Sequence, residues 1–270
     1  MKKIIQISTI LIFLLGLYAC EKPSVTRLKK EVERTNSYCP INGGISGDLL
    51  SVKYNQDLND VKFYYSLNEE YGSIILLKKN REYIYSNMRL MLQNSKTSDD
   101  LIKMLVGAKA SLTLIYKTSS SGKTTKFHLS NDEIEKIYNL PVLTAEETAK
   151  LWLSNSVAIQ NETCPQKVDE GMYTERVELI DDNIVYYCSM DENLYSIDIM
   201  KKNKAEMYKG IRDYFETTIS DPSMKRDVEN IITLNLGCQF RYYGKTTKRY
   251  LDIIITPEEL NAILQNHSEN

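Results

Sequence analysis

The pattern of apolar and polar residues along the chain predicts strands and helices in alternation. Residues 61–67 place Val61, Phe63 and Leu67 on one side with polar residues between them, which is the period-two pattern of a half-buried strand. From Ser73 onward the apolar residues instead recur at the spacing of one helical face. The chain therefore combines short strands with amphipathic helices.

This order of elements occurs twice. The motif Gly-Lys-Thr-Thr-Lys follows a strand-like run at Gly122–Lys126 and again at Gly244–Lys248. An Asn-x-x-Cys-Pro motif is also duplicated, with Cys39 and Cys164 as its cysteines. A repeat of about 125 residues is too long for a solenoid unit and has the size of one domain. The sequence thus predicts a tandem duplication.

Each copy is expected to contain a helix, a Cys-Pro loop, two strands, a long helix, a short helix, a β-hairpin and a final helix. The predicted fold class is α+β, with two tandem repeats, each a roughly four-stranded antiparallel sheet packed by one long and one short helix. In the second copy the long helix should run from Tyr195 through Phe215. Pro141 cannot continue the helix before it and marks the boundary between the copies. The expected segments are a signal peptide at 1–19, a lipid tether and N-terminal helix at 20–35, the first repeat at 36–140, a linker helix at 141–160, the second repeat at 161–266 and a tail at 267–270.

The first twenty residues have the features of an export signal. Lys2 and Lys3 precede an apolar run, Ile4–Tyr18, that is too short and too early for an ordinary spanning helix. The run continues into Leu-Tyr-Ala-Cys, which resembles the lipobox of bacterial lipoproteins and implies cleavage before Cys20 and acylation (palmitate) of its thiol. The mature protein is then expected outside the cytoplasm, lipid-anchored in the cell envelope. Glu21 in place of aspartate favours the outer membrane or cell surface, and a plain secretory signal with an incidental cysteine is the alternative.

Composition narrows the range of partners. With 42% hydrophobic and 26% charged residues, the chain has the make-up of a folded protein. The formal net charge is −2, and loss of Lys2 and Lys3 with the signal peptide would make it −4. Because there is no basic excess over the whole chain, nucleic acid is not an expected partner.

The Gly-Lys-Thr-Thr motifs invite comparison with a phosphate-binding loop. Such a loop needs another glycine five positions earlier and a helix immediately after it, whereas Lys117 and Gln239 occupy the glycine position and a strand follows each motif. Glycine at positive φ suits a tight hairpin turn. Both motifs are therefore predicted to be hairpin turns, and no cofactor is expected.

Four cysteines other than Cys20 allow three disulfide connectivities. Cys188 and Cys238 have no cysteine counterparts in the first copy, where Ser66 and Ser111 occupy the aligned positions. Both belong to strands that could neighbour one another. A Cys188–Cys238 disulfide is therefore predicted.

Cys39 and Cys164 could join the two equivalent loops as a disulfide, remain buried reduced thiols, or act as nucleophiles. A nucleophile needs a base, and the two histidines are His267 in the tail and His128 in a hairpin strand. A Cys39–His128 dyad is one candidate, and a solvent-facing strand histidine is the simpler interpretation. The sequence contains no CxxC or CxxH spacing, so no metal site is expected.

Acidic pairs occur where helices are expected to begin. Asp132-Glu133, Glu146-Glu147 and Glu258-Glu259 each follow a Ser or Thr at capping-box spacing. Asp181–Asn183 is predicted to be a hairpin turn, because it lacks the further spaced oxygens of a calcium loop. No catalytic residue is assigned.

Tyrosine is the compositional excess, at 19 residues against one Trp and five Phe. The adjacent pairs 64–65, 186–187 and 242–243 lie in predicted strands, so one ring of each pair should face the helices and the other solvent. Outward rings offer rigid amphipathic area for recognition, although they can also simply cover the sheet. Tyr64, Tyr187 and Tyr243 are thus candidate interaction residues, beside the structural candidates Cys39 and Cys164.

The Asn-x-x-Cys-Pro motif, the Tyr-Tyr strand, the long helix and the Gly turn together resemble small exported bacterial domains of unknown function. The resemblance covers residues 36–134 and 161–260 and implies an α+β fold without known catalytic residues. We expect a lipid-anchored extracytoplasmic binding or scaffold protein whose ligand is a protein, peptide or envelope glycan, and not an enzyme. The alternatives are an inhibitor of secreted hydrolases and a thiol-dependent enzyme using Cys39 or Cys164. The oligomeric state stays open.

Overall fold

The computed structural model describes residues 22–42, 47–69, 74–79, 81–94 and 96–268. The expected signal peptide and the expected lipidation site, Cys20, lie outside these residues. The chain divides into two compact units, one formed by Met1–Asn68 and Met88–Pro141 and the other by Glu69–Asn87 and Val142–Asn270. Within the described part, no helix is long and apolar enough to cross a membrane.

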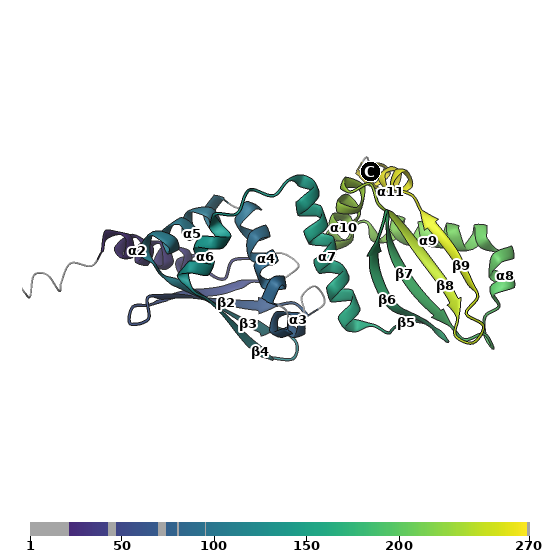
Figure 1. Cartoon of the computed structure of the whole chain (residues 1–270), viewed down its shortest axis with the longest axis horizontal. Helices are drawn as coiled ribbons and strands as arrows, with labels where there is room; N and C mark the ends of the chain where they lie inside the picture. Colours follow the sequence, from purple (N-terminus) through teal and green to yellow (C-terminus); the bar gives the residue numbers. More distant parts are fainter. Residues whose placement is uncertain (1–21, 43–46, 70–73, 80, 95, 269–270) are drawn as a thin grey trace, which may run out of the picture. The chain divides into compact units, whose positions relative to one another are not determined.

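Unit 1 is built around sheet A, with strand order β1-β2-β3-β4. Helices α2, α5 and α6 cover one face of this sheet (Figure 1). The helix α4 spans the division between the two units. The elements of unit 1 in chain order are α2 (Pro23–Ser37), β1 (Leu49–Asn55), β2 (Asp60–Leu67), the C-terminal half of α4 (Arg81–Asn94), α5 (Lys96–Ala108), β3 (Ser111–Thr118), β4 (Thr124–Leu129) and α6 (Asn131–Tyr138). Helix α3 (Ile74–Lys79) and the first half of α4 belong to unit 2.

Unit 2 is built around sheet B, with strand order β5-β6-β7-β8-β9. Its core joins the sheet to α7, α9, α10 and α11 through fully buried side chains such as Leu153, Ile219 and Ile255. The elements are α7 (Ala145–Thr163), β5 (Gln166–Asp169), β6 (Met172–Ile180), β7 (Asn183–Met190), α8 (Ile197–Lys202), α9 (Lys204–Thr218), α10 (Pro222–Thr233), β8 (Gly237–Gly244), β9 (Tyr250–Ile255) and α11 (Pro257–Ser268).

The predicted α+β class is confirmed, and the two sheets are compatible with a tandem duplication. The expectation that all strands are antiparallel is wrong for the central pairs, because β2 pairs with β3, and β7 with β8, in parallel. The physical reason is the connection between them. The helices between these strands carry the chain back to the starting end of the sheet, which gives a parallel neighbour, whereas the short turns elsewhere join antiparallel strands.

Four further expectations need correction. The long helix of the second copy is broken at Asn203 into α8 and α9, since Asn203 adopts a non-helical backbone conformation. The expected linker helix, α7, packs on α10 and β6 and is therefore an integral helix of unit 2. The last helix includes His267. Sheet B also has one more strand than expected, the short edge strand β5.

The strand register gives the equivalence of the two copies directly. Ser51 lies opposite Tyr64 as Arg176 lies opposite Tyr187, and each pair follows a β-bulge in the first strand. It follows that Cys188 occupies the position of Tyr65, one residue earlier than the Ser66 expected from the sequence. By the same reasoning Cys238 corresponds to Leu112 and His128 to Ile254.

The duplicated Asn-x-x-Cys-Pro motif joins a helix end to the sheet in both units. The Asn36 side chain accepts a hydrogen bond from the Val52 N–H at 2.9 Å, and Asn161 accepts one from Val177 at 2.8 Å. Asn161 also donates to the Val177 carbonyl at 2.8 Å. The Cys-Pro peptide bond that follows is cis in each copy. Both asparagines thus fix the first helix of their copy to the middle of the adjacent strand.

Candidate functional site

The face of each sheet opposite the covering helices carries the residues with the greatest potential for recognition. We call these the open face of sheet A and the open face of sheet B. Strand alternation and register define their members. On sheet A they are Ser51, Lys53, Asp60, Lys62, Tyr64, Ser66, Ser111, Thr113, Ile115, Lys117, Thr124, Lys126 and His128. On sheet B they are Arg176, Glu178, Val185, Tyr187, Ser189, Gln239, Arg241, Tyr243, Tyr250, Asp252 and Ile254.

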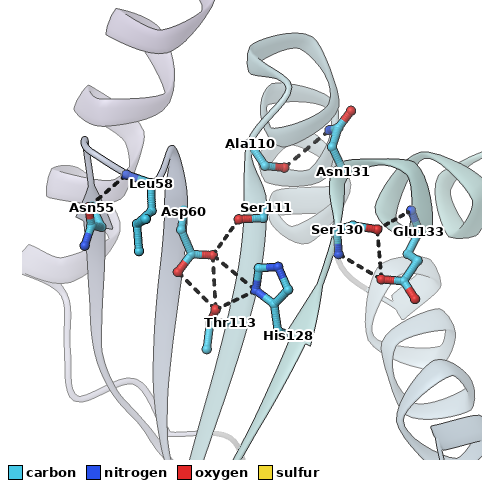
Figure 2. A network of polar contacts seen from close by, with 10 residues as sticks. All are labelled: Asn55, Leu58, Asp60, Ala110, Ser111, Thr113, His128, Ser130, Asn131 and Glu133. Atoms are coloured by element: carbon cyan, nitrogen blue, oxygen red, sulfur yellow. Dashed lines mark hydrogen bonds and ion pairs between the residues drawn. The ribbon is translucent and has the colours of Figure 1, made fainter.

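A polar cluster links three strands at one end of the open face of sheet A (Figure 2). The buried carboxylate of Asp60 accepts from the Ser111 hydroxyl at 2.8 Å and from the Thr113 hydroxyl at 3.0 and 3.1 Å. The Nδ1 atom of His128 lies 3.0 Å from the Thr113 hydroxyl oxygen and 3.8 Å from Asp60. One buried acid therefore gathers groups from β2, β3 and β4.

The number of hydrogen-bond donors around Thr113 determines the tautomer of His128. The Thr113 hydroxyl has a single proton, and it donates that proton to Asp60. It can then only accept from His128, so neutral His128 has its proton on Nδ1 and a bare Nε2. The His128 side chain is 59% exposed, which leaves an imidazole available to solvent.

This cluster differs from a hydrolytic triad in one decisive respect. A triad places the nucleophile on Nε2 and the acid on Nδ1. Here both hydroxyls donate to Asp60, and the one that meets His128 does so at Nδ1. In sheet B the equivalent positions are Asn183, Gly237, Gln239 and Ile254. The cluster is thus specific to unit 1 and serves to join strands.

A row of four cross-strand neighbours characterises the open face of sheet B. Arg176, Tyr187, Arg241 and Asp252 lie side by side on β6, β7, β8 and β9. The guanidinium carbons of Arg176 and Arg241 lie 3.7 and 5.9 Å from the centre of the Tyr187 ring. Cation–π contacts of this kind hold a flat aromatic and cationic surface in place.

The same row contains a two-pronged ion pair. Arg241 donates from Nε and Nη2 to the two Asp252 oxygens, both at 2.9 Å. Burial alone would raise the pKa of Asp252, but hydrogen bonds from Arg241 and Gln239 outweigh it and lower that pKa. Arg176 donates to Glu178 at 2.8 Å. Each arginine on this face therefore has a carboxylate partner.

The outward orientation predicted for Tyr64, Tyr187 and Tyr243 agrees with the register. In the second copy their neighbours turn inward: Tyr186 stacks on Phe240 with ring centres 4.8 Å apart. The signal that located these rings was strand alternation. The same alternation could not reveal the Asp60 cluster, because its members come from three strands whose register no single strand discloses.

All four described cysteines are free. The predicted Cys188–Cys238 disulfide is wrong, although β7 and β8 are neighbours, because Cys238 pairs with Ile184 and Cys188 with Tyr242. Four residues along a strand span ~13 Å, whereas bridged Cα atoms lie within ~7 Å. Burial raises the pKa of Cys188 to about 11 and of Cys238 to about 12.

Cys39 follows the end of α2, on the helix-covered side of sheet A, and its thiol donates to the Thr35 carbonyl oxygen of that helix at 3.5 Å, while Cys164 directly follows α7. Cys39 belongs to unit 1 and is an electrostatic neighbour of the buried Tyr65, while Cys164 belongs to unit 2 and neighbours Cys188. Burial raises the pKa of both thiols. Since His128 lies on the opposite face of sheet A, the Cys39–His128 dyad is excluded.

The two Gly-Lys-Thr-Thr motifs are hairpin turns, as predicted, but they are built differently. Gly122 has a φ of +66°, whereas in the second turn Lys248 takes the positive φ, at 58°, in place of Gly244. The carboxylate of Glu192 accepts from the Thr246 and Thr247 N–H groups at 2.8 and 2.9 Å. The second turn therefore does bind an anion, namely a side chain of its own unit, which a Cβ on Gly244 would overlap.

The acidic pairs cap helices, as their spacing predicted. Ser130 with Glu133 and Thr144 with Glu147 form complete capping boxes. At the start of α11 the Thr256 N–H donates to the Glu259 carboxylate at 2.8 Å and the Glu259 N–H donates to the Thr256 hydroxyl at 3.3 Å. Asp181, at a φ of +49°, forms part of the turn between β6 and β7.

A buried polar seam runs between α7 and α10 inside unit 2. Ser156 donates to Asp227 at 2.7 Å, and burial raises the pKa of that carboxyl. The Asp227 Oδ1, Asn155 Nδ2 and Asn230 Nδ2 atoms have no protein partner. Buried polar atoms of this kind are usually bridged by internal water. Across the described residues, no group of three His, Cys, Asp or Glu side chains could hold a metal ion.

The fold and the two faces define an α+β protein with two similarly connected sheets, each covered by helices on one side. The sequence matches no protein-family model, and no curated protein is similar to it at a significant level. A crystal structure of a Pseudomonas aeruginosa protein described as secreted aligns with 44% of this chain and 99% of its own, at 7% identity and a TM-score of 0.35. This likeness is too low to indicate a common fold or activity.

Proposed function

We propose that the protein is a lipid-anchored binding or scaffold protein of the cell envelope, which recognises its ligands through the open faces of its sheets. The observation that carries the proposal is the row Arg176–Tyr187–Arg241–Asp252 on sheet B. Tyr and Arg are the residues most enriched where proteins bind one another, since they combine rigid apolar area with polar edges.

The ligand class follows from the chemistry of this row. Two guanidinium groups flanking an aromatic ring suit a protein or peptide surface, and Tyr faces also stack on sugars, so an envelope glycan fits as well. Inhibition of a secreted hydrolase would be a narrower form of the same activity. A thiol-dependent enzyme has less support, because burial raises the pKa of each described thiol and so disfavours the reactive thiolate.

The anchor rests on the first twenty residues. The apolar run and the Leu-Tyr-Ala-Cys ending support export and acylation of Cys20, with the outer membrane or cell surface as the favoured location. Metabolic labelling with a palmitate analogue tests this directly. We expect label in the parent chain and none in Cys20→Ser; equal labelling of the two, or of neither, would contradict the anchor.

Recognition is tested by placing a photo-activated cross-linking amino acid at Tyr187 in the full chain, in living cells. The control site is Tyr214, an exposed tyrosine on helix α9 of the same unit. We expect a discrete cross-linked product from position 187 that is absent from position 214. The proposal fails if the two positions give the same products or if position 187 gives none.

A further inference from the structure

We infer that the open face of sheet A binds anionic phospholipid headgroups of the membrane to which Cys20 would be attached. The choice of ligand rests on the proposed anchor, whereas the charge of the face does not. Two independent features carry the inference: an uncompensated group of lysines, and the short length of chain between Cys20 and unit 1.

The strands of sheet A contain four lysines and a single acidic residue. That acid, Asp60, is buried and already accepts from two hydroxyls, so it presents no free negative charge at the surface. By register the lysines all lie on the open face. They are Lys53, Lys62, Lys117 and Lys126.

The arrangement of these lysines is unfavourable for the protein alone. Lys53 and Lys62 are directly opposite one another on β1 and β2, a placement in which like charges repel. Lys53 lies 5.4 Å from the centre of the Tyr64 ring. Among the described residues, Lys62, Lys117 and Lys126 have no carboxylate partner. An external anion would relieve this repulsion.

Sheet B shows that the fold itself does not require the lysines. The positions equivalent to Lys53, Lys62, Lys117 and Lys126 are Glu178, Val185, Tyr243 and Asp252. The arginines of that face are paired with carboxylates. The basic character is thus specific to the unit that follows the predicted lipid anchor.

The chain length between anchor and unit is very small. Only Glu21 and Lys22 separate Cys20 from Pro23, the first residue of α2. Three residue steps span at most about 11 Å. Helix α2 packs on β1, the edge strand of sheet A, so the anchor would hold unit 1 close to the membrane at this edge of the sheet. Attraction between basic residues and anionic lipids acts over a Debye length, about 8–10 Å at physiological salt.

Tyr64 at the centre of the face fits this setting. Its neighbours across the sheet are Ser51 and Ile115, so an aromatic and an aliphatic side chain are surrounded by lysines. Amphipathic rings of this kind prefer the boundary between headgroups and water. The open face of sheet A therefore combines the charge and the aromatic character of a membrane-surface contact.

The test uses the chain from residue 20 onward with Cys20→Ser, so that no acyl chain contributes. Sedimentation is measured with vesicles of phosphatidylcholine alone and of phosphatidylcholine with phosphatidylglycerol. We expect binding to the anionic vesicles only, falling as sodium chloride rises. Because each basic residue near an anionic surface strengthens binding about fivefold, replacing all four lysines by glutamine should weaken binding at least about tenfold. The variant carries Lys53→Gln, Lys62→Gln, Lys117→Gln and Lys126→Gln.

A matched control removes four exposed lysines from α8 and α9 of unit 2 and should bind like the parent. A second variant with arginine at the four sheet A positions should also bind like the parent, which separates charge from folding. The control carries Lys201→Gln, Lys202→Gln, Lys204→Gln and Lys209→Gln.

Four outcomes would overturn the inference: parent-like binding by the glutamine variant, equal weakening of the control, equal binding to neutral vesicles, or binding to a soluble anionic envelope polymer without binding to vesicles. None of these depends on acylation. Failure of the anchor itself would instead appear as absence of Cys20 labelling in cells, so the two proposals fail separately.

Discussion

The open faces of the two sheets place different chemistry on the same strand positions. The lysines of sheet A have no carboxylate partner among the described residues, whereas the arginines of sheet B are paired with carboxylates and packed on tyrosine. Two residues are shared: the central tyrosine, Tyr64 in one sheet and Tyr187 in the other, and a serine two residues further on, Ser66 and Ser189. The helix-covered faces, by contrast, stay apolar in both.

The two units thus differ mainly on the open faces of their sheets. An inward side chain must fit the packing of helix on sheet, so its replacements remain apolar. An outward side chain contacts mainly its cross-strand neighbours, so only these contacts restrict which residue can occupy the position. The Asp60 cluster is an example, because all of its positions differ in sheet B. Asn183 stands at the position of Asp60, Gly237 at that of Ser111 and Ile254 at that of His128.

The largest effect is expected from Asp60→Ala. The Ser111 and Thr113 hydroxyls would lose a buried charged acceptor, which should lower the free energy of unfolding of unit 1 by about 2–3 kcal/mol. The matched change Asn183→Ala in unit 2 should cost less than about 1 kcal/mol. Hydrogen exchange measured by mass spectrometry localises each loss to its sheet. Equal losses in both sheets would mean that the polar cluster does not distinguish the units.

Gly237→Ser tests whether sheet B can accept the residue found in sheet A. A Cβ at position 237 would lie 2.6 Å from the Asn183 Oδ1 atom and 3.1 Å from the Ile255 carbonyl oxygen. The resulting displacement should cost about 1–3 kcal/mol. Adding Asn183→Ala removes the nearest atom and should recover part of this loss in urea unfolding. If the double variant is no more stable than Gly237→Ser, the Asn183 contact is not the cause.

Much of the fold could be predicted from local pattern. Alternation in residues 61–67 located a strand and its inward face, and the Ser130–Glu133 spacing located a helix start. The parallel central pairs could not be predicted this way, because strand direction depends on the path of the intervening helices. The equivalence of Cys188 with Ser66 is wrong by one residue, because it matches the pair Tyr64-Tyr65 with Tyr186-Tyr187, whereas the register matches Tyr64 with Tyr187.

Less of the candidate site could be predicted from the sequence. Alternation placed Tyr187 outward, but nothing in one strand shows that Arg176, Arg241 and Asp252 share its row. The Asp60 cluster joins residues up to 68 positions apart in sequence, counted from Asp60 to His128. Register between non-adjacent segments is a property of the folded sheet. The sequence therefore predicts which residues face outward, but it does not predict which residues lie beside them in the sheet.

Arg241→Ala is expected to have a moderate effect confined to unit 2. Its two-pronged pair with Asp252 is partly exposed, so the loss should be about 1 kcal/mol. The pKa of Asp252 is lowered in the folded protein, so the pair stabilises at pH values above the unfolded pKa and is lost as pH falls through the folded pKa. Urea unfolding of Arg241→Ala and the parent should therefore differ at neutral pH and converge in acid.

The matched change on sheet A is Lys126→Ala, at the position equivalent to Asp252. Since Lys126 has no carboxylate partner among the described residues, its removal should change stability by less than about 0.5 kcal/mol at any pH. A loss that matches Arg241→Ala, with the same acid dependence, would contradict the contrast between a paired and an unpaired face.

The last prediction concerns the reactivity of the thiols and involves no change in stability. Thiol reactivity measures how well the helices shield the covered faces of the sheets. In the Cys20→Ser chain at neutral pH, Cys188 and Cys238 should react very slowly with a thiol reagent, because burial shields them and raises their pKa to about 11 and about 12. The half-buried Cys39 and Cys164 should react sooner. Denaturant without reductant should release all four thiols. Release of only two thiols would instead show a disulfide. Peptide mapping would then identify the partner of Cys188. That partner would be either Cys164, its neighbour in unit 2, or Cys238, which the β7–β8 register places too far away.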